Sequence, residues 1–139
     1  MSPDPNLVVN DAVNLTMTAL DAAARTPSVK RVVITSSSAA VDSYPKEPYD
    51  LTAESWNEKA VEEAWKPPPY EEDRVYTTYA ASKVQSEQAA WRYVRDTKPH
   101  FVLNAVLPDF VCGPPLSVER QGFSSSIMVL KWLFDNQQG

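Results

Sequence analysis

The sequence KRVVITSSS, residues 30–38, holds three consecutive apolar β-branched residues, Val32, Val33 and Ile34, followed by Thr35 and a run of serines. Consecutive β-branched residues are typical of a parallel strand covered on both faces, so we predict a buried strand over residues 30–35. A second apolar run, FVLNAVL at residues 101–107, predicts another strand. Residues 79–97 between them have the apolar spacing of a helix. This order predicts a βαβ unit with parallel strands.

The flanking segments add helices before and after this unit. Asp4 can cap a first helix whose first helical residue is Pro5, and its apolar stripe runs to residue 24. Thr77 or Thr78 can cap the long helix. Residues 42–76 are rich in loop signals, with a short helix over residues 52–64, and residues 124–136 predict a last helix. We therefore predict an α/β fold: one partial domain over residues 1–139, with an incomplete Rossmann-like (doubly wound) parallel sheet flanked by helices.

Composition excludes several classes of protein. The formal net charge of −5 argues against a nucleic-acid partner, which needs a basic surface. No apolar run approaches the roughly 18 residues of a membrane span, and no secretory signal is visible at the start. The single cysteine, Cys112, fits a reducing compartment, and no Cys/His cluster has metal-ligand spacing. We expect a cytoplasmic protein with no membrane, nucleic-acid or metal partner.

The motif YAASK, residues 79–83, is the main candidate for chemistry. Tyr79 and Lys83 stand four residues apart on the predicted helix, so their side chains share one face. An ammonium beside a phenol stabilises the phenolate, which makes tyrosine a usable general acid at neutral pH. Tyr79 is therefore expected to be the tyrosine whose acidity its surroundings change most. Taken alone, the pair also fits a solvated helix surface.

Serines end the first predicted strand at the sheet edge where α/β proteins bind ligands. One hydroxyl there can bond a substrate carbonyl oxygen, although serines also commonly close a strand and begin a turn. Because side chains alternate along a strand, neighbouring serines should point in opposite directions. We expect Ser37, rather than Ser36 or Ser38, to face Tyr79.

Glycine is scarce. The chain has three glycines, at positions 113, 122 and 139, so it lacks the Gly-rich loop that holds a cofactor pyrophosphate. These features predict the catalytic half of a nicotinamide-dependent enzyme without its nucleotide-binding half. A two-stranded sheet also leaves a strand edge uncovered, which predicts a homo-oligomer or a partner chain along that edge.

Three motifs together resemble the extended short-chain dehydrogenase/reductases: VVITSS at residues 32–37, YAASK at residues 79–83 and LPDFVCGP at residues 107–114. Within that family the sequence is most similar to the dihydroflavonol reductase, cinnamoyl-CoA reductase and fungal aldehyde/ketone reductase group. The resemblance covers nearly all of this chain but only the middle of the family's usual length. It implies a truncated member that reduces a small carbonyl substrate, an aldehyde or ketone.

The resemblance also implies a role for each matching residue. Ser37 would orient the carbonyl oxygen, Tyr79 would donate the proton, and Lys83 would assist Tyr79 and hold the nicotinamide ribose. The implied cofactor is NADP or NAD. Residues expected to lie against it are Thr35, Ser36, Pro108 and Val111, together with Tyr79 and Lys83.

Two other functions stay open. One is a non-redox family member that acts as a binding or scaffold protein through its exposed strand edge. Alternatively, Tyr79 and Lys83 can serve a cofactor-independent isomerase or dehydratase.

Overall fold

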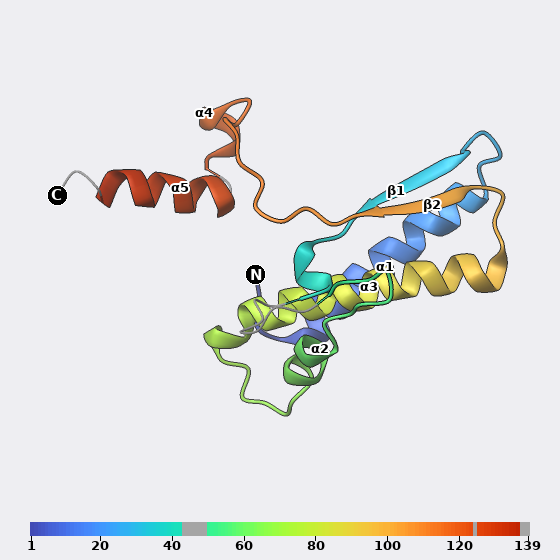
Figure 1. The fold of residues 1–139 in the computed structure, drawn as a ribbon, viewed down its shortest axis with the longest axis horizontal. Coiled ribbons are helices and arrows are strands. Elements are labelled where there is room, and N and C mark those ends of the chain that lie inside the picture. Colours follow the sequence, from blue (N-terminus) through green and yellow to red (C-terminus); the bar gives the residue numbers. More distant parts are fainter. Residues whose placement is uncertain (43–49, 124, 137–139) are drawn as a thin grey trace. The chain divides into compact units, whose positions relative to one another are not determined.

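The computed structural model describes residues 1–42, 50–123 and 125–136. These residues form two compact units, Met1–Leu107 and Pro108–Gly139. The elements of the first unit are α1 (Pro5–Ala24), β1 (Arg31–Thr35), the 3₁₀ turn η1 (Ser38–Ala40), α2 (Glu58–Ala64), the 3₁₀ turn η2 (Glu72–Arg74), α3 (Val75–Thr97) and β2 (Val102–Val106) (Figure 1). The second unit contains α4 (Val118–Gln121) and α5 (Ser125–Asn136).

The sheet of the first unit is parallel, as predicted. β1 pairs with β2 in a register that sets Arg31 opposite Val102 and Thr35 opposite Val106. The backbone N–H of Ser36 donates to the Val106 oxygen at 2.8 Å, which carries the pairing one residue beyond β1. The long helix α3 lies between the two strands in the chain, after the shorter α2, so the predicted βαβ unit and the α/β fold class are confirmed.

Local sequence signals explain α1. Asp4 is its N-cap, and the Asp4 carboxylate accepts a hydrogen bond from the Asn6 backbone N–H at 2.9 Å. Pro5 occupies the first helical position, where its missing N–H costs nothing. Val9 and Leu20 of the predicted stripe are buried. The helix stops at Ala24, before the Thr26-Pro27 pair.

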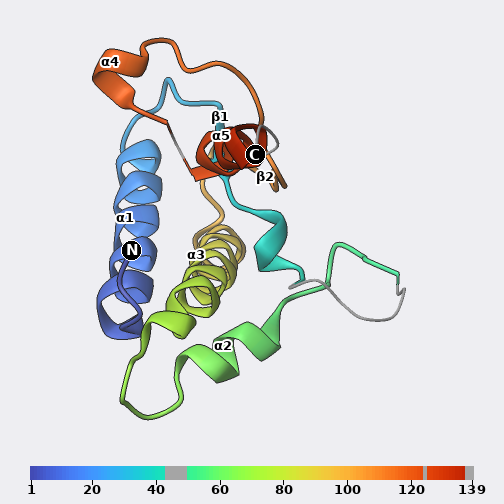
Figure 2. The same cartoon turned by 90° about the vertical axis from the view of Figure 1, so that its left-hand side faces the viewer.

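The main core lies between the sheet and two helices. Its buried residues are Leu20 of α1, Ala90 of α3, and Phe101 and Leu103 at β2, and partly buried hydrophobic residues including Val32 and Ile34 pack against them. Figures 1 and 2 show α1 and α3 side by side along the same face of the two strands. That arrangement gives the sheet one covered face.

The expectation of a strand covered on both faces is wrong for the described residues. Along β1, exposed and half-buried side chains alternate. The uncovered face carries Val33, Val102 and Val106, whose exposed fractions are 57%, 56% and 52%. The physical reason is that α1 and α3 both lie on the other side. A run of consecutive β-branched residues therefore does not indicate whether one face or both faces of a strand are covered.

The long helix α3 begins at Val75, earlier than predicted, and neither threonine caps it. Instead Thr78 is fully buried, and its hydroxyl donates to the Pro3 backbone oxygen at 2.9 Å. The helix ends at Lys98, which adopts a left-handed conformation with φ of 46°, one residue before Pro99. Thr78 thus makes a tertiary contact to the start of the chain, and the N-cap residue of α3 is Arg74, which makes no side-chain capping hydrogen bond.

The loop-rich segment is partly described. Its residues 43–49 lie outside the described part of the chain. The short helix α2 starts at Glu58, six residues later than predicted, because Asn57 caps it through a hydrogen bond from Ala60 N–H to Asn57 Oδ1 at 3.1 Å. Ala60 and Ala64 of this helix are buried.

In the second unit, the predicted last helix is present as α5, and α4 is an additional short helix. Ser117 caps α4 by accepting from the Arg120 N–H, and Gly122 ends it with φ of 64°. The Ser126 hydroxyl donates to the Val111 backbone oxygen at 2.6 Å. The single domain over residues 1–139 stays a prediction. Within the described ranges, no helix combines the length and apolar character needed to cross a bilayer.

Candidate active site

Lys83 is the residue around which the candidate site is built. Its ammonium nitrogen lies 3.3 Å from the backbone oxygen of Thr35, the last residue of β1. The same nitrogen lies 5.7 Å from the centre of the Tyr79 ring. Three residues selected from the sequence, Thr35, Tyr79 and Lys83, are therefore brought together at the carboxyl end of β1. The Tyr79 and Lys83 side chains share one face of α3, as their spacing predicts.

Buried neighbours on α3 explain why the helix presents the face that carries Tyr79 and Lys83. Ala80, Ala81 and Val84 are fully buried, and packing of these residues fixes the rotation of the helix about its axis. Tyr79 itself packs against a small cluster of Ala39, Ala60 and Ala80. The catalytic candidates thus lie where helix α3, the turn η1 and the end of β1 meet.

The two serines after Thr35 are both buried but differ in their contacts. Ser37 caps η1, and its Oγ accepts a hydrogen bond from the Ala39 backbone N–H at 3.2 Å. The Ser36 Oγ has no hydrogen-bond partner among the described residues. No hydrogen bond joins Ser37 to Tyr79 within the described part of the chain. The expected pairing of Ser37 with Tyr79 stays a prediction.

Asn57 holds the turn η1 that follows these serines, and it is not among the site residues selected from the sequence. Its side-chain nitrogen donates to the Ala39 oxygen at 3.0 Å, and its backbone N–H donates to the Ala40 oxygen at 2.9 Å. Asn57 is buried, so these bonds join η1 firmly to the start of α2. The sequence signal that could have identified Asn57 is an asparagine directly before a helical pattern, which is a common N-cap.

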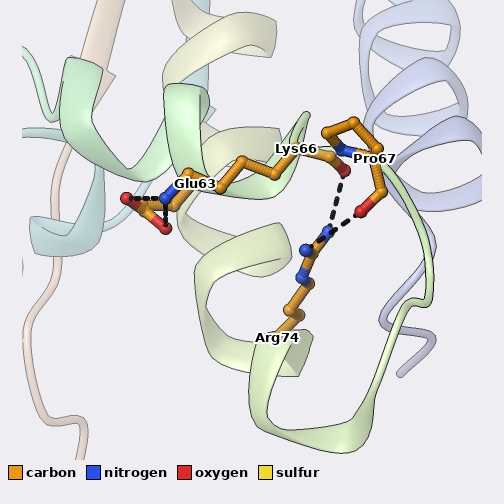
Figure 3. Close-up of polar contacts among 4 residues, drawn as sticks. All are labelled: Glu63, Lys66, Pro67 and Arg74. Atoms are coloured by element: carbon orange, nitrogen blue, oxygen red, sulfur yellow. Dashed lines mark hydrogen bonds and ion pairs between the residues drawn. The ribbon is translucent and has the colours of Figure 1, made fainter.

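Arg74 anchors the loop that leads into α3, as Figure 3 shows. Its guanidinium donates to the backbone oxygens of Lys66 at 2.8 Å and Pro67 at 3.1 Å, and it lies 5.6 Å from the centre of the Tyr70 ring. Beside it, the Lys66 ammonium bonds to Glu63 at 2.6 Å and holds the pKa of that carboxyl below its usual value. Arg74 precedes the first residue of α3, so it helps to set where the helix carrying Tyr79 begins.

Tyr93 of α3 is a phenol whose pKa is raised above its ordinary value. The causes are burial first and then the Asp21 carboxylate, which accepts its hydrogen bond and disfavours the phenolate. Tyr93 packs against the main core between α1 and α3. Its shift reflects that packing and not the chemistry at Lys83.

Two other predicted residues, Pro108 and Val111, belong to the second unit. Val111 is 64% exposed, and Pro108 is half-buried. Their predicted place against a cofactor stays a prediction. The described residues contain no group of three or more histidine, cysteine or acidic side chains able to hold a metal ion.

Comparison with known proteins places this geometry in a family. The chain is 40% identical to the NAD-dependent epimerase/dehydratase terH of Aspergillus terreus over 134 residues, which are 96% of this chain and 38% of that protein. It is 43% identical to aldehyde reductase 2 of Sporidiobolus salmonicolor over 121 residues, 86% of this chain and 35% of the relative. No family model matches the sequence.

A solved structure supports the same family assignment. The crystal structure of yeast methylglyoxal/isovaleraldehyde reductase Gre2, complexed with NADPH, matches with a TM-score of 0.61 and 30% identity, over 86% of this chain and 34% of Gre2. The chain belongs to the extended short-chain dehydrogenase/reductase family. It spans about 38% of the length of two such relatives, the NAD-dependent epimerase/dehydratases terH and tndE. The names of these relatives describe them as reductases or as NAD-dependent epimerase/dehydratases.

Proposed function

We propose that this chain carries the proton-donating side of a site that reduces an aldehyde or ketone with NADH or NADPH. The observation that carries the proposal is the position of the Lys83 ammonium, which contacts the Thr35 oxygen and lies over the Tyr79 ring. A phenol with an adjacent ammonium at the carboxyl end of a parallel strand suits proton donation to a bound substrate.

In the proposed reaction, Tyr79 donates its phenolic proton to the substrate carbonyl oxygen. The Lys83 ammonium then stabilises the phenolate that remains. Ser37 donates a hydrogen bond to the same carbonyl oxygen and orients it, since its Oγ can accept from Ala39 and still donate its own proton. When bound, the reduced nicotinamide supplies the hydride that the carbonyl carbon accepts, so the product is an alcohol.

The residues at this edge fit the nicotinamide end of such a cofactor. Lys83 has three N–H donors, and Thr35 takes one of them at the long distance of 3.3 Å, which leaves donors for ribose hydroxyls. Ser36 holds a buried hydroxyl with no partner among the described residues. We propose that Thr35, Ser36, Tyr79 and Lys83 contact this end, together with Pro108 and Val111.

Protein contacts to the pyrophosphate of the cofactor need a different source. The three glycines of the chain lie at positions 113, 122 and 139, and none forms a Gly-rich turn after a strand. We propose that the pyrophosphate contacts come from polypeptide outside these 139 residues, either continuous with it or a partner chain. The proposed site of action is the cytoplasm.

A second candidate is a non-redox binding role, favoured by the uncovered sheet face. Val33, Val102 and Val106 are each more than half exposed there. Apolar side chains exposed on an uncovered sheet face favour association with another polypeptide. In this alternative, Tyr79 and Lys83 stabilise the fold and transfer no proton.

A chimera tests the two candidates. The segment of aldehyde reductase 2 that matches this chain would be replaced by the corresponding residues of this chain, and oxidation of NADPH by an aldehyde would be followed. We expect activity that falls by about 10²- to 10⁴-fold in Tyr79→Phe. Tyr93→Phe, on the same helix, is the matched control and should keep most of the activity.

Full activity in the Tyr79→Phe chimera would contradict the proposed role. A folded chimera that shows no reduction would favour the binding role. A Tyr79-dependent conversion that needs neither NADH nor NADPH would favour an isomerase or dehydratase.

A further inference from the structure

A second candidate site lies in the first unit, on the surface formed by α1, α3 and the end of α2. It is a depression of about 420 Å³, within the usual range of small-molecule sites. Its lining residues come from all three helices: Val9, Asn10, Val13, Asn14, Trp65, Gln85 and Arg92. The arrangement of the three helices can be followed in Figure 2.

The apolar part of this depression is set by packing. Val9 is 2% exposed and Val13 is half-buried, and both belong to the cluster that joins α1 to Ala64 and Ala81. Trp65 follows α2 directly and is 38% exposed, so part of its indole faces solvent. The Val13 side chain and the Trp65 indole ring give a ligand with an apolar body a surface to cover, above the buried Val9.

The polar part is rich in hydrogen-bond donors. The Trp65 indole N–H donates to Gln85 Oε1 at 2.7 Å, so the Gln85 amide oxygen is engaged and its NH₂ group is the end left to donate. Arg92 makes no hydrogen bond or ion pair with another described residue. Asn10 and Asn14 add two amides one helical turn apart.

Arg92 gives the lining of the depression a positive charge. The chain carries a formal net charge of −5, yet the seven lining residues include a guanidinium and no carboxylate. A guanidinium matches the two oxygens of a carboxylate with parallel N–H donors. Adjacent amide donors can bond the same oxygens.

We propose that this depression binds a small organic carboxylate with an apolar, ring-sized body. Arg92 bonds the carboxylate, the Gln85 amide assists it, and Trp65 with Val13 covers the body. The site is separate from the candidate active site. Gln85 follows Lys83 by two residues, about 200° around the helix axis, so the two residues lie on opposite faces of α3.

Calorimetric titration of the whole chain with phenylacetate tests this proposal. Phenylacetamide has nearly the same shape without the charge, and acetate has the charge without the ring. We expect phenylacetate to bind, and both analogues to bind at least about tenfold more weakly, because each lacks one half of the recognition. In NMR spectra, the Trp65 indole N–H signal should move as phenylacetate is added.

Matched arginine variants complete the test. Arg92→Gln should weaken phenylacetate binding by at least about tenfold. Arg95→Gln is the control, because Arg95 is an exposed arginine on the same helix that pairs with Asp96 at 2.8 Å and does not line the depression. Absence of phenylacetate binding, equal binding of phenylacetamide, or equal losses in the two variants would overturn the proposal. None of these outcomes depends on the proposed reductase activity.

Discussion

Lys83 joins helix α3 to the carboxyl end of strand β1, since its ammonium lies 3.3 Å from the Thr35 oxygen while it stands 5.7 Å from the Tyr79 ring centre. One side chain therefore contacts both the sheet edge and the proposed proton donor. The contact spans 48 residues of sequence and depends on the packing of α3 against the sheet.

Replacing this lysine should damage both proposed tasks. In the chimera described above, Lys83→Met should lower kcat by about 10²-fold and raise the KM for NADPH, because the phenolate and the ribose both lose a cationic donor. Steady-state kinetics measure both values. Lys59→Met, at an exposed position of α2, should change neither. Unchanged kinetics in Lys83→Met would remove Lys83 from the site.

The two serines after β1 should differ in their effect on stability. Ser37→Ala should destabilise the chain by about 0.5–2 kcal/mol, because the Ala39 N–H loses its capping acceptor. Ser36→Ala should be neutral or stabilising, because its buried hydroxyl has no partner among the described residues. Urea unfolding of the two variants measures the difference. A larger loss in Ser36→Ala would show that its hydroxyl has a partner.

The raised pKa of Tyr93 predicts how the stability of the folded chain changes at alkaline pH. Its folded-state pKa is raised above the ordinary value of 10.0, so the folded chain holds the phenolic proton more tightly than the unfolded chain. The resulting stabilisation is complete below about pH 10 and is lost as the pH rises through the folded-state pKa. The stability gap between wild type and Tyr93→Phe should therefore narrow above pH 10 in urea unfolding experiments. A gap that stays constant would contradict the shift.

Cofactor binding by the chain alone should be weak. The described residues proposed to contact the cofactor address its nicotinamide end, and the sequence has no Gly-rich turn for the pyrophosphate. Calorimetry with NADPH and with NADH should detect no low-micromolar binding. Tight binding would reveal a nucleotide site of another kind in this sequence.

The uncovered sheet face should drive self-association. Sedimentation should detect species larger than the 15.5 kDa monomer, because exposed valines and unpaired strand edges favour contact between copies. Val33→Lys should shift the distribution toward monomer. Leu7→Lys is the matched control, since Leu7 is 58% exposed on α1 and Val33 is 57% exposed. A wild-type chain that sediments as a pure monomer would contradict this expectation.

The sequence alone was enough for features that depend on neighbouring residues. The cap and first residue of α1, the order of strand, helix and strand, and the shared face of Tyr79 and Lys83 all follow from spacings of a few residues. Such patterns are readable because one turn of helix or one pleat of strand repeats the same geometry. The parallel pairing also followed, since a helix long enough to cross over separates the two strands.

Only the tertiary structure decided features that join distant segments. Thr78 contacts Pro3 instead of capping α3, Asn57 holds the turn after β1, and a single face of the sheet is covered by helices in the described residues. No local pattern reports these outcomes, because each depends on which surface a distant segment meets after the chain has packed. The same holds for Trp65 and Gln85, whose hydrogen bond across 20 residues shapes the proposed carboxylate site.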